Sequence, residues 1–138
     1  MSLADDIKTV LNADASLLAI LTGGVHVGIM EINRQDASGA FDATTKEIKP
    51  CALIKLGVEN KLSDTRRGVQ TPITIYLYER NGYSSINAAM VKIFNHLNEE
   101  KIGTNTWNIR HSNTVYDQRD IALDCSLATL RFVAVREL

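Results

Sequence analysis

Cysteine is scarce in this sequence, and long hydrophobic runs are missing. The two cysteines, Cys51 and Cys125, lie far apart in apolar stretches, which is more typical of buried reduced thiols in a cytosolic protein than of a disulfide or a metal pair. Because no run reaches about 18 apolar residues, we expect no membrane-spanning helix. Residues 1–6 are acidic from the start, so we expect no signal peptide either.

An excess of charge of either sign is also missing. The chain carries 15 basic and 16 acidic residues, with a formal net charge of -1, and they are scattered along its length. Proteins that hold duplex DNA by its phosphates usually carry a basic stripe, so direct and tight DNA binding is disfavoured. With 138 residues, 45% of them hydrophobic, the chain is long enough for one globular domain with its own core.

Motifs for catalysis or metal binding are absent as well. No GxSxG, P-loop or GxGxxG sequence occurs, and no histidine has Cys, Asp or Glu at ligand spacing. An acidic cluster near the C-terminus does not match the ligand positions of an EF-hand, and a solvated corner between strands explains it better. The residues considered are His26, His96, His111, Asp117, Arg119, Asp120 and Asp124. We therefore predict no enzyme, no metal and no cofactor.

The spacing of apolar residues predicts a pair of N-terminal helices and one long helix. Ser2 and Asp5 form a capping-box pattern for the first helix, and Asp14 is a suitable N-cap for a short second one. A longer apolar stripe predicts a helix over residues 84–101 that Gly103 ends. Its stripe consists of Ile86, Ala89, Met90, Ile93, Phe94 and Leu97.

Alternating apolar residues predict the strands. A short strand is expected within residues 25–32, longer strands at 51–58 and 69–79, a short one around Trp107 and Ile109, and the longest at 125–135. Pro72, which has no N–H to donate, should lie near a strand start or on an edge. Residues 59–68 and 116–124 are read as a charged turn, which includes Asp64, and a polar corner. The predicted fold is α+β, with an antiparallel or mixed sheet of four to five strands in the order α-β-β-β-α-β-β.

Residues 33–49 are polar and small, and they are longer than most loops inside a compact domain. We interpret them as a flexible insertion, or as an arm that becomes ordered on binding, within a single domain that spans residues 1–138.

The last predicted strand is apolar on both sides. Ala128, Leu130, Phe132 and Ala134 alternate with a second set that consists of Cys125, Leu127, Val133 and Val135. A strand of this kind is usually covered on both faces. Either the helices divide between the two faces of the sheet, or one face is left for another subunit.

Three stretches together resemble the tail-terminator (tail-completion) proteins of long-tailed bacteriophages, the family of the lambda minor tail protein U. They are RGVQTPITIYLY at 67–78, the helix that follows, and YDQRD at 116–120 with CSLATLRFVAV at 125–135. The N-terminal helix and the overall length also fit, so the resemblance covers nearly the whole chain.

The resemblance implies a structural protein that forms a ring of six copies, caps the tail tube, stops its polymerisation and offers a head-joining surface. Its partners would be copies of itself, the tail-tube protein and a head–tail connector protein, with DNA passing through unbound. It would be assembled in the bacterial cytoplasm and reside in the virion tail. A ring needs two different patches on each subunit. The candidate contact residues are Tyr76, Tyr78, Leu127, Val133, Arg66 and Arg67.

Two other classes of function stay open on the sequence alone. A small ligand-binding or regulatory module of the same architecture would have one concave pocket lined by aromatic side chains. An enzyme would require His26, His111 and residues 117–124 to converge in space.

Overall fold

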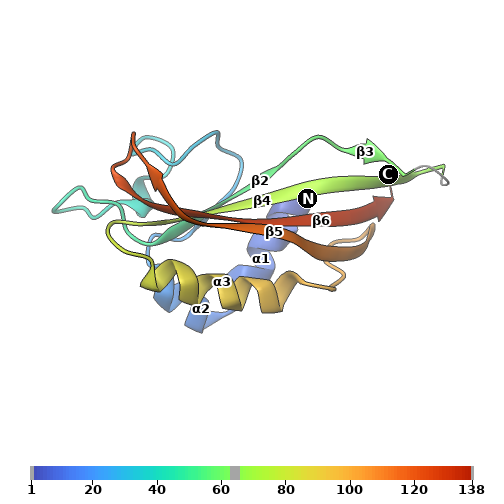
Figure 1. Cartoon of the computed structure of the whole chain (residues 1–138), viewed down its shortest axis with the longest axis horizontal. Helices are drawn as coiled ribbons and strands as arrows, with labels where there is room; N and C mark the ends of the chain where they lie inside the picture. The colour runs from blue at the N-terminus through green and yellow to red at the C-terminus, as the bar shows by residue number, and fades with distance from the viewer. Residues whose placement is uncertain (1, 63–65, 138) are drawn as a thin grey trace.

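The computed structural model describes residues 2–62 and 66–137, and its centre is one mixed β-sheet (Figure 1). The sheet has six strands in the order β1-β2-β4-β6-β5, and β3 also pairs with β4. Only the β1–β2 pair is parallel. The strands are β1 (Val25–His26), β2 (Cys51–Leu56), β3 (Asn60–Lys61), β4 (Gly68–Glu79), β5 (Thr106–Asp120) and β6 (Cys125–Glu137). The α+β prediction is confirmed, with one strand more than expected.

Three α-helices lie together on one face of the sheet (Figure 1). They are α1 (Leu3–Asn12), α2 (Ala15–Ile20) and α3 (Ser84–Leu97). The predicted caps are present: Ser2 and Asp5 form the capping box of α1, and the Asp14 carboxylate accepts from the backbone N–H groups of Ser16 and Leu17. None of the helices in the described part of the chain is long and apolar enough to span a membrane.

The first core lies between these helices and the sheet. The helices contribute their apolar faces, and the β6 side chains Ala128, Leu130, Phe132 and Ala134 meet them, all at most 2% exposed. The matching positions of β4, Ile73, Ile75 and Leu77, are fully buried beside them. One of the two apolar sets of β6 is therefore satisfied by the chain's own helices.

Several predicted boundaries were wrong. Helix α3 ends at Leu97 and not at 101, because the chain turns at Glu99, with φ 61°, and Glu100 bridges to Ile109. Strand β2 ends at Leu56, before 58. Strand β5 continues through most of the predicted polar corner, and the turn occupies only 121–124. Three register shifts along β5 break the two-residue alternation, so its apolar pattern was not recognisable in the sequence.

Pro72 is the fifth residue of a central strand, where β4 lacks a neighbour on one side. The last β2 pair is at Ile73 and the first β3 pair at Gln70, so no ladder partner stands opposite Pro72 on that side. In an antiparallel strand, the N–H and the C=O of one residue point to the same side. The Pro72 carbonyl accepts from Gly57 N at 2.8 Å on the side of β2 and β3, so an N–H at this position would point there too. The N–H that proline lacks would therefore point to a place where β4 has no paired strand. This is locally the edge position that the sequence predicts for Pro72.

Truncation of the two faces of β6 should have unequal effects. Phe132 is fully buried beneath the helices, whereas its neighbour Val133 faces the other side and is only partly buried. We expect Phe132→Ala to lower the free energy of unfolding by about 3–5 kcal/mol and Val133→Ala by about 1 kcal/mol or less. Urea unfolding of both variants measures this, and equal losses would contradict the packing described.

A second prediction concerns pH and the contact between α2 and α3. His96 Nε2 lies 2.7 Å from Asp14 Oδ2, and this hydrogen bond, followed by that from Ser16, holds the pKa of Asp14 well below its usual range. Near these pKa values the folded state binds fewer protons than the unfolded state. The ionised Asp14 therefore adds to the free energy of unfolding above pH 3.8, and this stabilisation is lost as the pH falls through the folded-state pKa.

The variant Asp14→Asn isolates this contribution, because asparagine is an equally good N-cap but carries no charge. We expect it to be less stable than the parent at neutral pH, with a difference that shrinks below pH 3.8. Urea unfolding over a series of pH values tests the expectation. A difference that stays constant with pH would contradict it.

Candidate functional site

The face of the sheet opposite the helices, here called the outer face, is covered over only half its length. The segment 27–50, here called the arm, folds across the half near the β5–β6 turn (Figure 1). Toward the other end, none of the described segments covers the outer-face side chains of β4, β6 and β5 in this way. The helices therefore do not divide between the two faces, and the chain's own arm supplies part of the missing cover.

A second core lies beneath the arm. The arm contributes Ile32, Ala37, Ala40, Phe41 and Ile48, and the sheet contributes Cys51, Leu53, Tyr78 and Cys125. Three of the predicted contact residues lie here: Tyr78 is 5% exposed, and Tyr76 and Leu127 are partly buried at its border. In this arrangement they pack within the chain.

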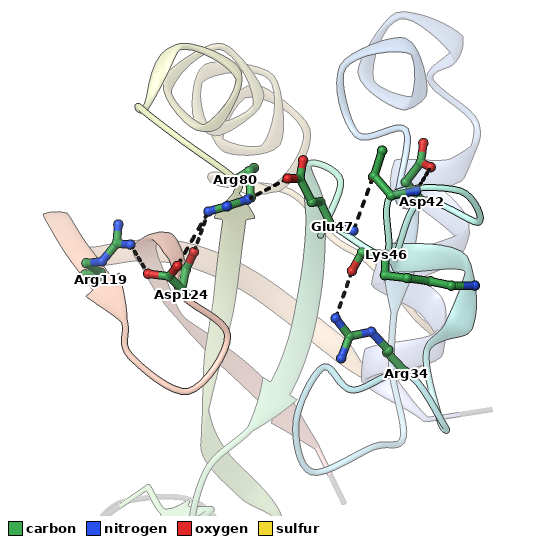
Figure 2. Close-up of polar contacts among 8 residues, drawn as sticks. Arg34, Asp42, Lys46, Glu47, Arg80, Arg119 and Asp124 are labelled. Atoms are coloured by element: carbon green, nitrogen blue, oxygen red, sulfur yellow. Dashed lines mark hydrogen bonds and ion pairs between the residues drawn. The ribbon is translucent and has the colours of Figure 1, made fainter.

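The arm satisfies many of its own polar groups. Asn33 Oδ1 accepts from two backbone N–H groups, and Asp42 Oδ1 accepts from those of Thr44 and Thr45, which lowers the Asp42 pKa. Arg34 donates to the Lys46 carbonyl at 2.8 Å (Figure 2). The Arg34 guanidinium also lies 5.0 Å above the Phe41 ring. The segment predicted to be flexible thus has a defined internal structure, and its mobility in solution stays a prediction.

A chain of charged side chains joins the arm to the β5–β6 turn (Figure 2). Arg80, just after β4, contacts Glu47 of the arm at 3.6 Å and donates to the Asp124 carbonyl at 3.0 Å. Asp124 also pairs with Arg119, and Glu47, Arg80 and Asp124 border a cavity of about 220 Å³. Exposed ion pairs of this kind each contribute little to the free energy of unfolding. They therefore orient the arm relative to the turn but add little to the stability of that contact.

The histidines and the acidic cluster do not converge. His26 is in β1 and His111 in β5, at opposite edges of the sheet, which places them on the order of 20 Å apart. His26 contacts the Gly23 carbonyl and His111 contacts Thr114 Oγ1, each through Nε2. Among residues 2–62 and 66–137, no group of three His, Cys, Asp or Glu side chains is placed to hold a metal ion.

The uncovered half of the outer face contains a shallow depression of about 560 Å³. Among the described residues that line it, none is acidic, and Arg110 is the one with a full positive charge. The lining consists of Gln70, Trp107, Asn108, Arg110, His111, Ser112, Val133 and Val135. Of the predicted contact residues, Val133 lines this depression.

Arg66 and Arg67 are exposed at the same end of the sheet, directly before the Gly68–Glu137 pair. Asp64, which the sequence placed in the same turn, lies outside the described residues. The row Lys55, Thr74, Arg131 and Asn113 crosses the outer face in register and separates the covered half from the open half. The open half therefore carries Arg110, with Arg66, Arg67 and Glu137 at its end.

A second groove, between α3 and β5, was missed by the sequence analysis. It has a volume of about 480 Å³ and contains three exposed apolar side chains, Val91 at 62%, Tyr116 at 60% and Phe94 at 36%. Met90 and Leu130 complete its apolar part, and His111 also lines it. The apolar residues of β5 were the available signal, but the register shifts hid the length of that strand.

Thiol reactivity should report on the arm. Burial raises the pKa of Cys51 to about 12, with the neighbouring Cys125 adding to the effect. Burial and the charge of Asp120 raise the pKa of Cys125 to about 11. Little thiolate is then present at pH 8, and we expect both thiols to react slowly with a disulfide reagent such as DTNB.

Removing an arm side chain should speed this reaction. Phe41→Ala deletes a buried ring of the second core. We expect it to lower the free energy of local opening of the arm by about 2 kcal/mol or more, which raises the population of the open form more than tenfold. Phe94→Ala, on the opposite face, is the control and should leave the thiol rate unchanged. Equal rates in the parent and in Phe41→Ala would show that the arm does not protect these cysteines.

Comparisons with known proteins give a likeness of fold. No known protein family matches the sequence, and no curated protein matches it. Among solved structures, the chain is similar to one in the virion of a native gene transfer agent (GTA) particle. The likeness has a TM-score of 0.69 and covers 99% of this chain and 96% of that one, at 17% sequence identity. At that identity it shows a shared fold.

Proposed function

We propose that this protein is a structural component of a phage-like virion, and that it acts as a tail terminator. In this role a ring of copies caps the tail tube, stops its polymerisation and provides the surface for joining the head. The observation that carries the proposal is the likeness of fold, over nearly the full length of both chains, to a chain of the GTA virion. The resemblance of residues 67–78 and 116–135 to tail-terminator proteins agrees with it.

The open half of the outer face supports assembly with other copies. β6 is apolar on both sides, and Val133 and Val135 stay partly uncovered although all three helices and the arm are in place. In a ring, each copy presents two different patches, so open sheet on one part of the molecule meets another part of the next copy. Arg66 and Arg67, exposed at the same end, are further contact candidates.

The remaining partners follow from this role. The ring is a hexamer that binds the tail-tube protein on one side and a head–tail connector protein on the other, in the virion tail, after assembly in the host cytoplasm. DNA passes through without being gripped, which agrees with a net charge of -1. We propose a non-catalytic role, supported by the separate structural contacts of His26, His96 and His111.

One feature favours a second candidate function, a small-ligand module. The α3–β5 groove joins Phe94, Tyr116 and His111 around about 480 Å³, as an apolar ligand site would. A screen of small aromatic and aliphatic compounds tests this function. A saturable rise in melting temperature that Val91→Glu abolishes would support it, and no rise with any compound would count against it.

Solution mass distinguishes the tail-terminator role. We expect light scattering to detect a closed oligomer near six times 15.3 kDa, either alone or on addition of purified tail tubes. Added protein should also stop the elongation of tube subunits at a stoichiometry of one ring per tube. A species that stays monomeric at high concentration, with and without tubes, and leaves elongation unchanged would refute the role.

A further inference from the structure

The β5–β6 turn is an apolar tip surrounded by negative charge. Ile121 at its apex is 89% exposed, more than any other large hydrophobic side chain in the described part of the chain. Asp117, Asp120 and Asp124 lie around it, and Arg119 is the neighbouring cation. A solitary exposed isoleucine is unremarkable on a surface, but here it stands at the end of the β5–β6 hairpin, whose Leu123 packs against the second core.

The turn is held in one shape by its own contacts. Asp120 Oδ1 accepts from Leu123 N at 2.9 Å, which closes the turn. Arg80 donates to the Asp124 carbonyl, and Arg119 pairs with the Asp124 carboxylate. Both cations are thereby directed to Asp124, while Asp117 is exposed and has no ion-pair partner among the described residues. A preformed turn loses little conformational entropy on docking.

The depression at the other end of the outer face has complementary properties. Trp107, 41% exposed, and the partly buried Val133 and Val135 offer apolar contact, and Arg110 lies among them. Arg131 and Lys55 lie farther along the same face, at the border of the covered half, where Lys55 donates to the Met30 carbonyl of the arm and Arg131 donates to Asn113. An apolar and negative tip thus has an apolar and positive counterpart on the same molecule.

One copy cannot join these two features to each other. Ser112 lines the depression and Ala122 is in the turn. The neighbouring residues His111 and Asp120 pair with Phe132 and Cys125, seven residues apart on β6, so the two sites are separated by about 23 Å or more. The sheet between them is a continuous ladder of β5 and β6. The tip of one copy and the depression of another are therefore the pair that can meet, and this is a heterologous contact.

We propose that the β5–β6 turn of one copy docks in the outer-face depression of the next copy, with Ile121 against Trp107, Val133 and Val135. This inference rests on the proposed ring assembly and names its contact. The α3–β5 groove, the other uncovered apolar surface, is left free for a different partner. Because β5 has three register shifts, a continuous ladder between sheet edges is disfavoured, and side chains carry the contact.

Cross-linking between engineered cysteines tests the contact. Ser112→Cys and Ala122→Cys both change exposed residues and leave Ile121 and the cations in place. A disulfide needs Cα atoms within about 7 Å, so no bond forms within one copy. When the two single variants are mixed under mild oxidation, we expect a covalent dimer that contains one of each. The double variant should give a ladder of covalent oligomers. The native thiols, with their raised pKa values, give little background.

Asn87→Cys is the matched control, because Asn87 is exposed and lines the α3–β5 groove. Paired with Ala122→Cys, it should cross-link at least about tenfold more slowly. In addition, Ile121→Ser should weaken assembly by about 10- to 100-fold, as expected when one buried isoleucine contact is lost. Val91→Ser should leave assembly unchanged.

The outcomes separate the inference from the proposed function. Oligomers that form normally but show no Ser112–Ala122 cross-link, or that cross-link faster through Asn87, overturn the inference and leave the ring intact. Assembly that survives Ile121→Ser but fails with Val91→Ser overturns it in the same way. A parent protein that is monomeric under every condition, with and without tail tubes, overturns both.

Discussion

The structure depends on one constraint: strands β4 and β6 carry side chains that need cover on both faces, while all three helices lie on one. Four alternate side chains of β6 are sealed by the helices. The opposite set, from Cys125 to Val135, must find other cover, because apolar surface in water is unfavourable at roughly 25 cal/mol per Å². The arm supplies this cover over one half of the outer face. The remaining half is the surface from which the functional proposals follow.

The two cores differ in how firmly they are held. The helix-side core is closed by capped helices and a long antiparallel ladder between β4 and β6. The second core is closed by the arm, whose attachment at the end of the sheet consists of exposed ion pairs around Arg80. Such pairs are weak and are screened by salt. Local opening should therefore begin at the arm, so this face can respond to a partner without loss of the fold.

The sequence predicted those parts of the fold that depend on local chemistry. Ser2 and Asp14 cap helices as expected, and the alternation in β4 and β6 identified their buried sets. Strand β5 was underestimated, because its register shifts move side chains between faces. The placement of the arm depends on contacts between residues far apart in the chain, such as Phe41 with the Cys51 and Cys125 region. The sequence placed Tyr78 among the contact residues because the segment that covers it, the arm, has the composition of a polar loop.

Composition conceals how charge is arranged on this molecule. A net charge of -1 indicates no preferred partner, yet the turn at residues 117–124 is acidic while the depression in the open half of the outer face contains Arg110. The two regions lie at opposite ends of the same sheet, so a copy cannot neutralise itself across that distance. Copies that associate tip to depression place opposite charges in contact and repeat the same step at each addition. A series of identical contacts closes into a ring when the rotation that relates one copy to the next divides a full turn evenly. In a closed ring, every tip occupies a depression.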